Sequence, residues 1–123
     1  MRSLAGLLLT VVAGCGSGPA APDVTSHAMQ IESVDVLVAE SSPPQVSARV
    51  RGIIPDGCSR AGVVALSRAG NAITLSVFVD RENAGQPCIQ IIEVYDRVHR
   101  LPGDFPPGHY TLTVNGVIRA FVI

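Results

Sequence analysis

Short apolar stretches separated by turn residues constrain the fold of this chain more than any other feature. From Met29 onward they recur about every ten to fifteen residues, and most alternate apolar with polar side chains. Alternation with period two gives a strand one apolar face, whereas an amphipathic helix requires a period near 3.6. The pattern therefore predicts an all-β domain over residues 29–123.

Two strands are defined best by this pattern. Gln45–Ile54 places Val46, Ala48 and Val50 on one face before a Pro-Asp-Gly turn. Ile73–Val79 alternates equally well and follows a turn at Ala69-Gly70-Asn71. Further strands are predicted at 31–38, with a bulge or edge position near Ser33, at 61–68, and at 89–98.

The C-terminal segment predicts a β-hairpin with a two-residue loop. Asn115-Gly116, a pair preferred in type I′ turns, lies between the alternating runs 110–114 and 117–123. The expected cross-strand pairs are Val114 with Val117, Leu112 with Arg119, and Tyr110 with Phe121. Arg119 then falls on the core face, so either its guanidinium reaches the edge of the sheet or the register differs.

Seven strands in about 95 residues favour an immunoglobulin-like antiparallel β-sandwich. A transthyretin-like sandwich is the alternative. The stretch Leu101–Tyr110, rich in Pro and Gly, resembles the corner before a late strand, where a tyrosine hydroxyl bonds to nearby backbone. This resemblance predicts that the Tyr110 hydroxyl hydrogen-bonds to the loop before it.

The N-terminal residues have the pattern of an export signal. Met1-Arg2 precedes the uncharged, apolar run Leu4–Val12, which is shorter than the about 20 residues of a membrane-spanning helix. Val12-Ala13-Gly14-Cys15 follows and resembles the lipobox of bacterial lipoproteins. The resemblance implies removal of residues 1–14 and attachment of lipid to the Cys15 thiol, which anchors the protein outside the cytoplasm.

Three further expectations follow from this N-terminus. Residues 15–28 are predicted to be the lipidated cysteine and a flexible tether, because they lack apolar periodicity. An Asp at position 16 would favour retention in the inner membrane, so Gly16 favours the outer membrane if the bacterium has two membranes. In a bacterium with one membrane, we expect the protein at the cell surface. The alternative is an ordinary secretory signal that a cysteine happens to follow.

Lipid attachment at Cys15 leaves two cysteines, Cys58 and Cys88, in an oxidising compartment. An even pair in that setting predicts one disulfide. Closing a loop of about 30 residues contributes about 3–4 kcal/mol in the chain-entropy model. A redox or metal pair is the alternative, but no Cys-x-x-Cys spacing or adjacent histidine supports it.

Charge and motifs exclude several functions. The net charge is −1, and about −2 without Arg2, so no basic stripe is available for nucleic acid. No Gly-x-Ser-x-Gly motif, phosphate-binding loop or metal-ligand spacing occurs, so we expect no enzyme, cofactor or metal. The histidine candidates are His27, which lies in the expected tether, and His99 with His109, which could approach each other beside Asp96 or Asp104.

One polar stretch is a candidate binding surface. In Glu93–Arg100, the side chains Tyr95, Arg97 and His99 share one face of a strand. Tyrosine and arginine are favoured at binding hot spots, so the three predict an exposed stripe for a partner. The alternative is an edge strand whose charges prevent unwanted pairing.

Four segments in a fixed order resemble small secreted bacterial and archaeal modules without a characterised function. They are Gly52–Cys58, Arg68–Asn71, Cys88 and Pro107–Gly116. The resemblance covers about residues 30–123 and implies an exported, disulfide-linked β-sandwich, but no catalytic residue. The stretch 89–100 departs from the pattern, since charged and aliphatic residues are mixed there.

These observations favour a lipid-anchored envelope protein that presents a non-catalytic structural or protein-binding module. The alternative is a small inhibitor or ligand-binding domain. In that alternative, the loops Asp80–Pro87 and Leu101–His109 form the binding surface at one end of the sandwich.

Overall fold

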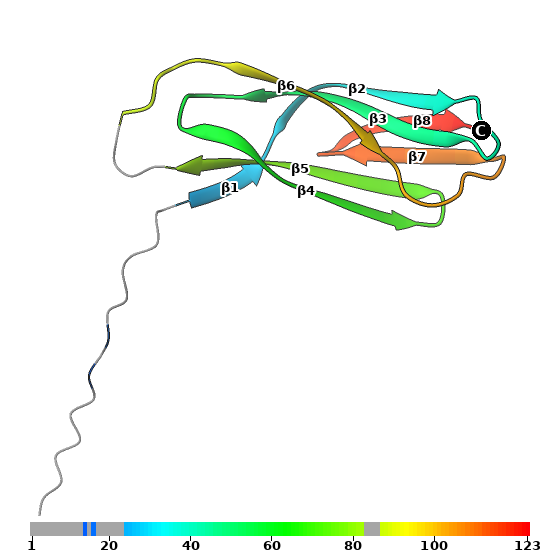
Figure 1. Cartoon of the computed structure of the whole chain (residues 1–123), viewed down its shortest axis with the longest axis horizontal. Helices are drawn as coiled ribbons and strands as arrows, with labels where there is room; N and C mark the ends of the chain where they lie inside the picture. Colours follow the sequence, from blue (N-terminus) through cyan, green and yellow to red (C-terminus); the bar gives the residue numbers. More distant parts are fainter. Residues whose placement is uncertain (1–13, 15, 17–23, 83–86) are drawn as a thin grey trace, which may run out of the picture.

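The computed structural model describes residues 24–82 and 87–123, together with Gly14 and Gly16. These residues form eight strands in two packed sheets (Figure 1). The strands are β1 (Val24–Ala28), β2 (Gln30–Ala39), β3 (Gln45–Ile54), β4 (Ser59–Ala69), β5 (Ala72–Glu82), β6 (Glu93–Arg100), β7 (His109–Val114) and β8 (Val117–Val122). No helix in the described part of the chain is long and apolar enough to cross a bilayer.

The larger sheet is organised around β5. On one side β5 pairs with β4 along most of its length, through the hairpin predicted at Gly70-Asn71. On its other side, β1 lies beside residues 78–82 and β7 lies beside residues 72–75. The β5–β7 pair is parallel, whereas the other pairs in both sheets are antiparallel. β8 completes this five-stranded sheet.

The smaller sheet has the order β2-β3-β6. Strand β3 has the bounds predicted from its alternation, and Val46, Ala48 and Val50 are buried. The register of β2 against β3 shifts between Ile31 and Ser33, so the predicted bulge is present, and β2 is also an edge strand. Gly52 leaves room for the crossover from β1, because a Cβ there would lie 2.6 Å from Met29 Sδ.

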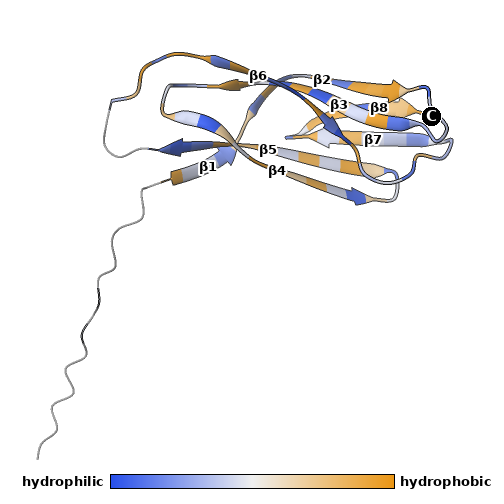
Figure 2. Ribbon diagram, in the orientation of Figure 1, coloured by the Kyte–Doolittle hydropathy of each residue, from blue (hydrophilic) through white to orange (hydrophobic). Residues whose placement is uncertain are grey.

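The two sheets enclose one apolar core. Strand β5 contributes Ile73, Leu75, Val77 and Val79, which alternate with more exposed residues as predicted. The other buried residues are Met29, Val34, Val46, Ala48, Val50, Ile54, Tyr95, Leu101, Phe105, Tyr110, Leu112 and Val114. Apolar residues also lie outside the core, notably in the loop that leads into β6 (Figure 2). The predicted immunoglobulin-like β-sandwich with one disulfide is confirmed.

Asn115 does more than form the hairpin turn. Its φ of 46° and that of Gly116, 85°, are the positive values that a type I′ turn requires. Its amide Oδ1 accepts from Val77 N at 2.9 Å, and Nδ2 donates to the carbonyls of Met29 and Val77, both at 2.8 Å. The side chain thus satisfies backbone groups at the point along the edge of β5 where β1 and β7 both end.

The predicted C-terminal hairpin is correct in strand pairing and register. Val114 pairs with Val117, Leu112 with Arg119, and Tyr110 with Phe121. Arg119 keeps its place in this register because its Nε donates to Val34 O at 3.3 Å and its Nη1 donates to Ile118 O at 2.9 Å. A core-side arginine is accommodated when its guanidinium reaches carbonyls at the edge of the core.

Strands β2, β4 and β5 extend beyond their predicted bounds, and two segments have a different structure from the one predicted. Residues 24–28 were expected in the tether, but they form β1 and pair with residues 78–82. Their side chains are exposed, so the strand depends on backbone hydrogen bonds that no apolar alternation reveals. Strand β6 spans 93–100 rather than 89–98, and residues 89–92 form a loop.

Candidate functional site

The predicted stripe of Tyr95, Arg97 and His99 lies on one face of β6, where Tyr95 is buried, His99 is half-buried and Arg97 is exposed. Tyr95 is only 3% exposed, which contradicts the expected exposed position of its ring. Its Oη hydrogen-bonds to His99 Nε2 at 2.8 Å, and the Arg97 guanidinium carbon lies 5.2 Å from the centre of its ring. The exposure of Tyr95 was mispredicted because alternation identifies residues that share a face without identifying which of them are buried.

Burial also changes the proton affinities of Tyr95 and His99. Burial raises the pKa of Tyr95, partly offset by the positive charge of Arg97. Burial and then the same charge lower the pKa of His99. Neutral His99 is therefore the favoured partner of the Tyr95 hydroxyl. Tyr95 and His99 thus form a hydrogen-bonded pair on the side of β6 opposite Asp96.

The exposed row of β6 consists instead of Val94, Asp96 and Val98. Asp96 receives two hydrogen bonds from Arg49 on β3, from Nε at 2.9 Å and from Nη2 at 2.7 Å. Arg51 Nε lies 3.7 Å from the same carboxylate. The two valines flank this cluster and are 58% and 57% exposed. We call these five residues the outer face.

Electrostatics make the polar centre of the outer face an ion pair at neutral pH. The hydrogen bonds and charge of Arg49 lower the pKa of Asp96, and Asp96 in turn raises the pKa of Arg49. Because the pair is exposed to solvent, it contributes little to stability. A planar guanidinium held flat by a carboxylate is instead suited to orienting a contact surface.

A shallow hollow of about 280 Å³ continues the outer face toward the β2 bulge. It is lined by Glu32, Ser33, Arg51, Gly52, Ile53, Ile92 and Val94. The register could not be read from the sequence, so the pairing of Asp96 with arginines of β3 was not predicted. Arginines spaced two residues apart on β3 were the only sequence signal of this cluster.

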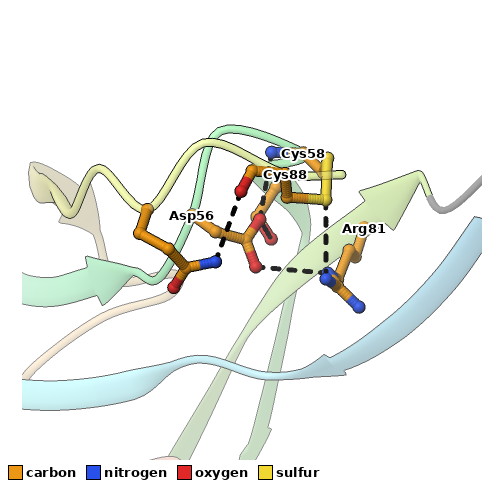
Figure 3. Close-up of a disulfide and its surroundings, with 6 residues drawn as sticks. Asp56, Cys58, Arg81 and Cys88 are labelled. Carbon is orange, nitrogen blue, oxygen red and sulfur yellow. Dashed lines mark hydrogen bonds and ion pairs between the residues drawn. A yellow bond between two sulfur atoms is a disulfide. The ribbon is translucent and has the colours of Figure 1, made fainter. Parts of the chain in front are cut away.

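The predicted disulfide is present, with Cys58 and Cys88 joined across the end of the sandwich (Figure 3). Asp56 Oδ1 accepts hydrogen bonds from Cys58 N and Ser59 Oγ, and its Oδ2 accepts from Arg81 Nε at 3.2 Å. Hydrogen bonding, chiefly from Ser59, lowers the pKa of Asp56 against an opposing effect of burial. The Arg81 guanidinium also reaches the sulfur of Cys88, at 3.5 Å.

Other predicted site residues are separated or lie elsewhere. Cys15 lies outside the described residues. His99 is on β6 in the smaller sheet and His109 is on β7 in the larger sheet. Within 24–82 and 87–123, one group of three potential metal ligands converges, Asp56 with Cys58 and Cys88, and its sulfurs are bonded to each other.

The two loops of the predicted ligand site lie at opposite ends of the sandwich, so that prediction is wrong. Strand β5 runs from the end where β7 begins, after Leu101–His109, to the end where Asp80–Pro87 follows (Figure 1). Residues 83–86 of the second loop lie outside the described residues. The first loop instead borders a hollow of about 480 Å³ lined by Pro43, Pro44, Asp104, Phe105, Pro106, Pro107 and Ile123.

Comparison with known protein families identifies the family of this β-sandwich. The model of the ORF11 beta-sandwich domain matches residues 48–123, from within β3 to the last residue of the sequence. The chain belongs to the ORF11 β-sandwich domain family. The ORF11 match includes Arg49, Arg51 and Asp96 of the outer face as well as both cysteines of the disulfide.

Relatives of this ORF11 domain occur in Herpetosiphon aurantiacus. An uncharacterised 10.2 kDa protein in the HgiCIIM 5′ region is 38% identical over 92 residues, which are 75% of this chain and 97% of the relative. A second uncharacterised 10.2 kDa protein, in the HgiBIM 5′ region, is 31% identical over 80 residues, 65% of this chain and 96% of the relative. No solved structure matches.

Proposed function

We propose that this ORF11 protein is an extracytoplasmic lipoprotein that presents a non-catalytic protein-binding surface in the bacterial envelope. The lipobox-like Val12-Ala13-Gly14-Cys15 supports anchoring through Cys15. The outer face supports protein binding. Its two valines are more than half exposed beside the Arg49–Asp96 pair, and exposed apolar side chains bordered by polar groups are typical of protein-binding surfaces.

The proposed binding surface is the outer face and not the exposed surface in general. The two arginines and Asp96 form one cluster on adjacent strands, and Tyr95 and His99 pack beneath it. A rigid sheet positions contact groups more accurately than a loop does. A partner with a flat surface that offers a carboxylate to Arg51 and an apolar group to Val98 would complement this face.

Site-specific photocrosslinking in intact cells tests the protein-binding proposal. A photoreactive side chain replaces Val98 on the outer face, and in a matched control it replaces Ile118 on the opposite sheet, where exposure is 62%. We expect one defined crosslinked protein from position 98 and none from position 118. Asp96→Arg should abolish the crosslink, because it places three cations together without a carboxylate. Identical crosslinks from both positions would contradict the proposal.

The anchor is tested separately. Mass spectrometry of the protein from native membranes should find an acylated N-terminal Cys15, and Cys15→Ser should move the protein from the membrane to the soluble fraction. Both measurements are independent of the outer face. An unmodified Cys15 in the membrane fraction would contradict the proposed lipid attachment.

A further inference from the structure

The loop before β6 exposes three large apolar side chains in succession. Ile89, Ile91 and Ile92 are 68%, 61% and 66% exposed, although they immediately follow the disulfide. We call these three residues the isoleucine segment, which is coloured as apolar in Figure 2, to the left of β6. Exposed clusters of this kind mark contacts with proteins or membranes.

The backbone of the isoleucine segment is held in place while its side chains point outward. Ile89 O accepts hydrogen bonds from Gly57 N at 2.8 Å and from Ile91 N at 2.9 Å. The disulfide fixes the preceding residue, Cys88, to Cys58. A loop that contacts hydrocarbon must have its backbone polar groups bonded, and this carbonyl meets that requirement.

The isoleucine segment lies at the end of the sandwich where β1 begins. Val24, the first residue of β1, pairs with Glu82. The Glu82 amide donates to Cys58 O at 3.1 Å, and Cys58 is bonded to Cys88, next to Ile89. One backbone hydrogen bond and one disulfide therefore connect the start of the folded domain to the segment. The start of β1 and the loop that leads into β6 both lie toward the left in Figure 1.

The sequence limits how far this end can lie from an anchor at Cys15. Nine residue steps separate Cys15 from Val24, and nine fully extended residues span at most about 30 Å. The ten residues of strand β3, which also span nine steps, extend about 30 Å along the sandwich to the opposite end. The tether therefore joins the domain at the end that carries the isoleucine segment, and the opposite end lies about 30 Å further from the point of attachment.

We infer that the isoleucine segment inserts into the lipid surface and orients the anchored domain, an inference that rests on the proposed anchor at Cys15. Two ion pairs lie near this end, Arg81 with Asp56 at 3.2 Å and Arg60 with Glu82 at 3.5 Å. Aliphatic side chains gain free energy when they leave water for the acyl region. With that end at the membrane, the loops at the opposite end project away from it.

Photolabelling from lipid tests this inference in full-length mature protein. Vesicles of phosphatidylethanolamine and phosphatidylglycerol contain a phospholipid with a diazirine on its acyl chain, and mass spectrometry locates the labelled residues. We expect label on Ile89, Ile91 and Ile92 but not on Val122, which is 63% exposed at the opposite end. Ile89→Ser/Ile91→Ser/Ile92→Ser should reduce labelling of the loop by about tenfold or more, since transfer of one isoleucine is worth about that factor.

A second arm separates this inference from the proposed acylation. The Cys15 thiol is coupled to a maleimide phospholipid, which supplies an anchor at position 15 whether or not cells acylate it. If native Cys15 is unmodified but the coupled protein is labelled at the isoleucine segment, the proposed anchor fails and the surface contact stands.

Three outcomes would each overturn the lipid contact. They are equal labelling of Val122 and the isoleucine segment, no labelling of the segment, and a crosslinked protein that covers Ile91 and prevents its labelling by lipid. An intact disulfide and an unchanged unfolding midpoint verify that the triple variant is folded. Ile91→Ser alone provides the milder variant if the triple variant is not.

Discussion

The two ends of the sandwich are held together by different chemistry. At the end where β5 finishes, Asp56 and Arg81 form an ion pair beside the Cys58–Cys88 disulfide. At the opposite end, Phe105, Tyr110 and Phe121 form an aromatic cluster with ring centres 5.3 to 6.3 Å apart. The disulfide end depends on oxidation and ionisation, whereas the aromatic end depends on neither.

The aromatic end uses charge in a different way. Arg68 places its guanidinium carbon 4.4 Å from the centre of the Phe105 ring and donates to the carbonyls of Gly70 and Pro102. Stacking of a guanidinium on a ring requires no carboxylate partner. Of the two ends, the one proposed to face the membrane contains a disulfide, so its stability should depend on redox conditions. The stability of the aromatic end should not.

Removing Phe105 is expected to have the largest effect on either end. Phe105 is 2% exposed and contacts two other rings, so Phe105→Ala should lower the free energy of unfolding by about 3–5 kcal/mol. Urea unfolding with and without a dithiol reductant measures it, and the loss should be the same in both. Ile118→Ala, on the surface, should change it by less than about 0.5 kcal/mol. A loss from Phe105→Ala that appears only under reducing conditions would break the distinction between the ends.

Loss of the disulfide is the corresponding change at the other end. Cys58→Ala/Cys88→Ala opens a loop with a sequence separation of 30, and the expected cost is about 3–4 kcal/mol. Hydrogen exchange locates the effect. The amide of Glu82, bonded to Cys58 O, should lose protection first, and that of Ile123, bonded to Gly108 O, should lose it only on global unfolding. Equal loss at both amides under native conditions would contradict local opening.

The sequence predicted the aromatic end more completely than the face of the smaller sheet. The hairpin register and the Tyr110 corner follow from local rules, because a two-residue Asn-Gly turn aligns its strands and the hydroxyl partner is four residues away. The disulfide followed from counting cysteines. Arg68 over Phe105 was beyond prediction, since it joins the end of β4 to a loop 37 positions later.

The outer face was missed for a physical reason. The sequence placed Tyr95, Arg97 and His99 on one side of β6 correctly, but it favoured exposure because the residues are polar. Burial of the Tyr95 ring is possible because its hydroxyl is bonded to His99. The valines then face solvent, an inversion that hydropathy alone does not predict. Strand β1 was missed likewise, because its side chains carry no apolar pattern.

Tyr110→Phe sharpens the comparison at the aromatic end with a smaller change. The Tyr110 hydroxyl donates to Pro106 O at 2.6 Å, and its removal should cost about 1 kcal/mol while the ring packing is kept. The acceptor is a backbone carbonyl and no carboxylate or cysteine takes part in this bond, so the cost should be equal at pH 5 and pH 8 and with or without reductant. Thermal unfolding at the two pH values measures it. A cost that changes between them would mean that ionisation reaches this end too.

Asp56→Asn is expected to have the smallest effect of these changes, and that effect should be present at neutral pH and disappear in acid. The pKa of Asp56 is lower in the folded protein than its ordinary value of 3.8, because Ser59, Cys58 N–H and Arg81 bond its carboxylate. The folded state therefore binds fewer protons than the unfolded state. The contribution of the Asp56 carboxylate to stability is complete above pH 3.8 and is lost as the pH falls through the pKa of Asp56 in the folded protein.

The measurement follows the unfolding midpoint from pH 7 to pH 2.5. The unfolding midpoint of the wild-type protein should decrease as the pH is lowered below about 4, and this decrease should be smaller for Asp56→Asn. In the wild-type protein, the Cys58 amide should lose its protection from hydrogen exchange before the Ile123 amide does. Asp96→Asn is the matched control, since the pKa of Asp96 is also lowered, but on the outer face. It should flatten the global curve without changing protection at Cys58. Were Asp96→Asn to change Cys58 protection as much as Asp56→Asn does, acid would act on the whole sandwich, and the disulfide end would not be an independently sensitive region.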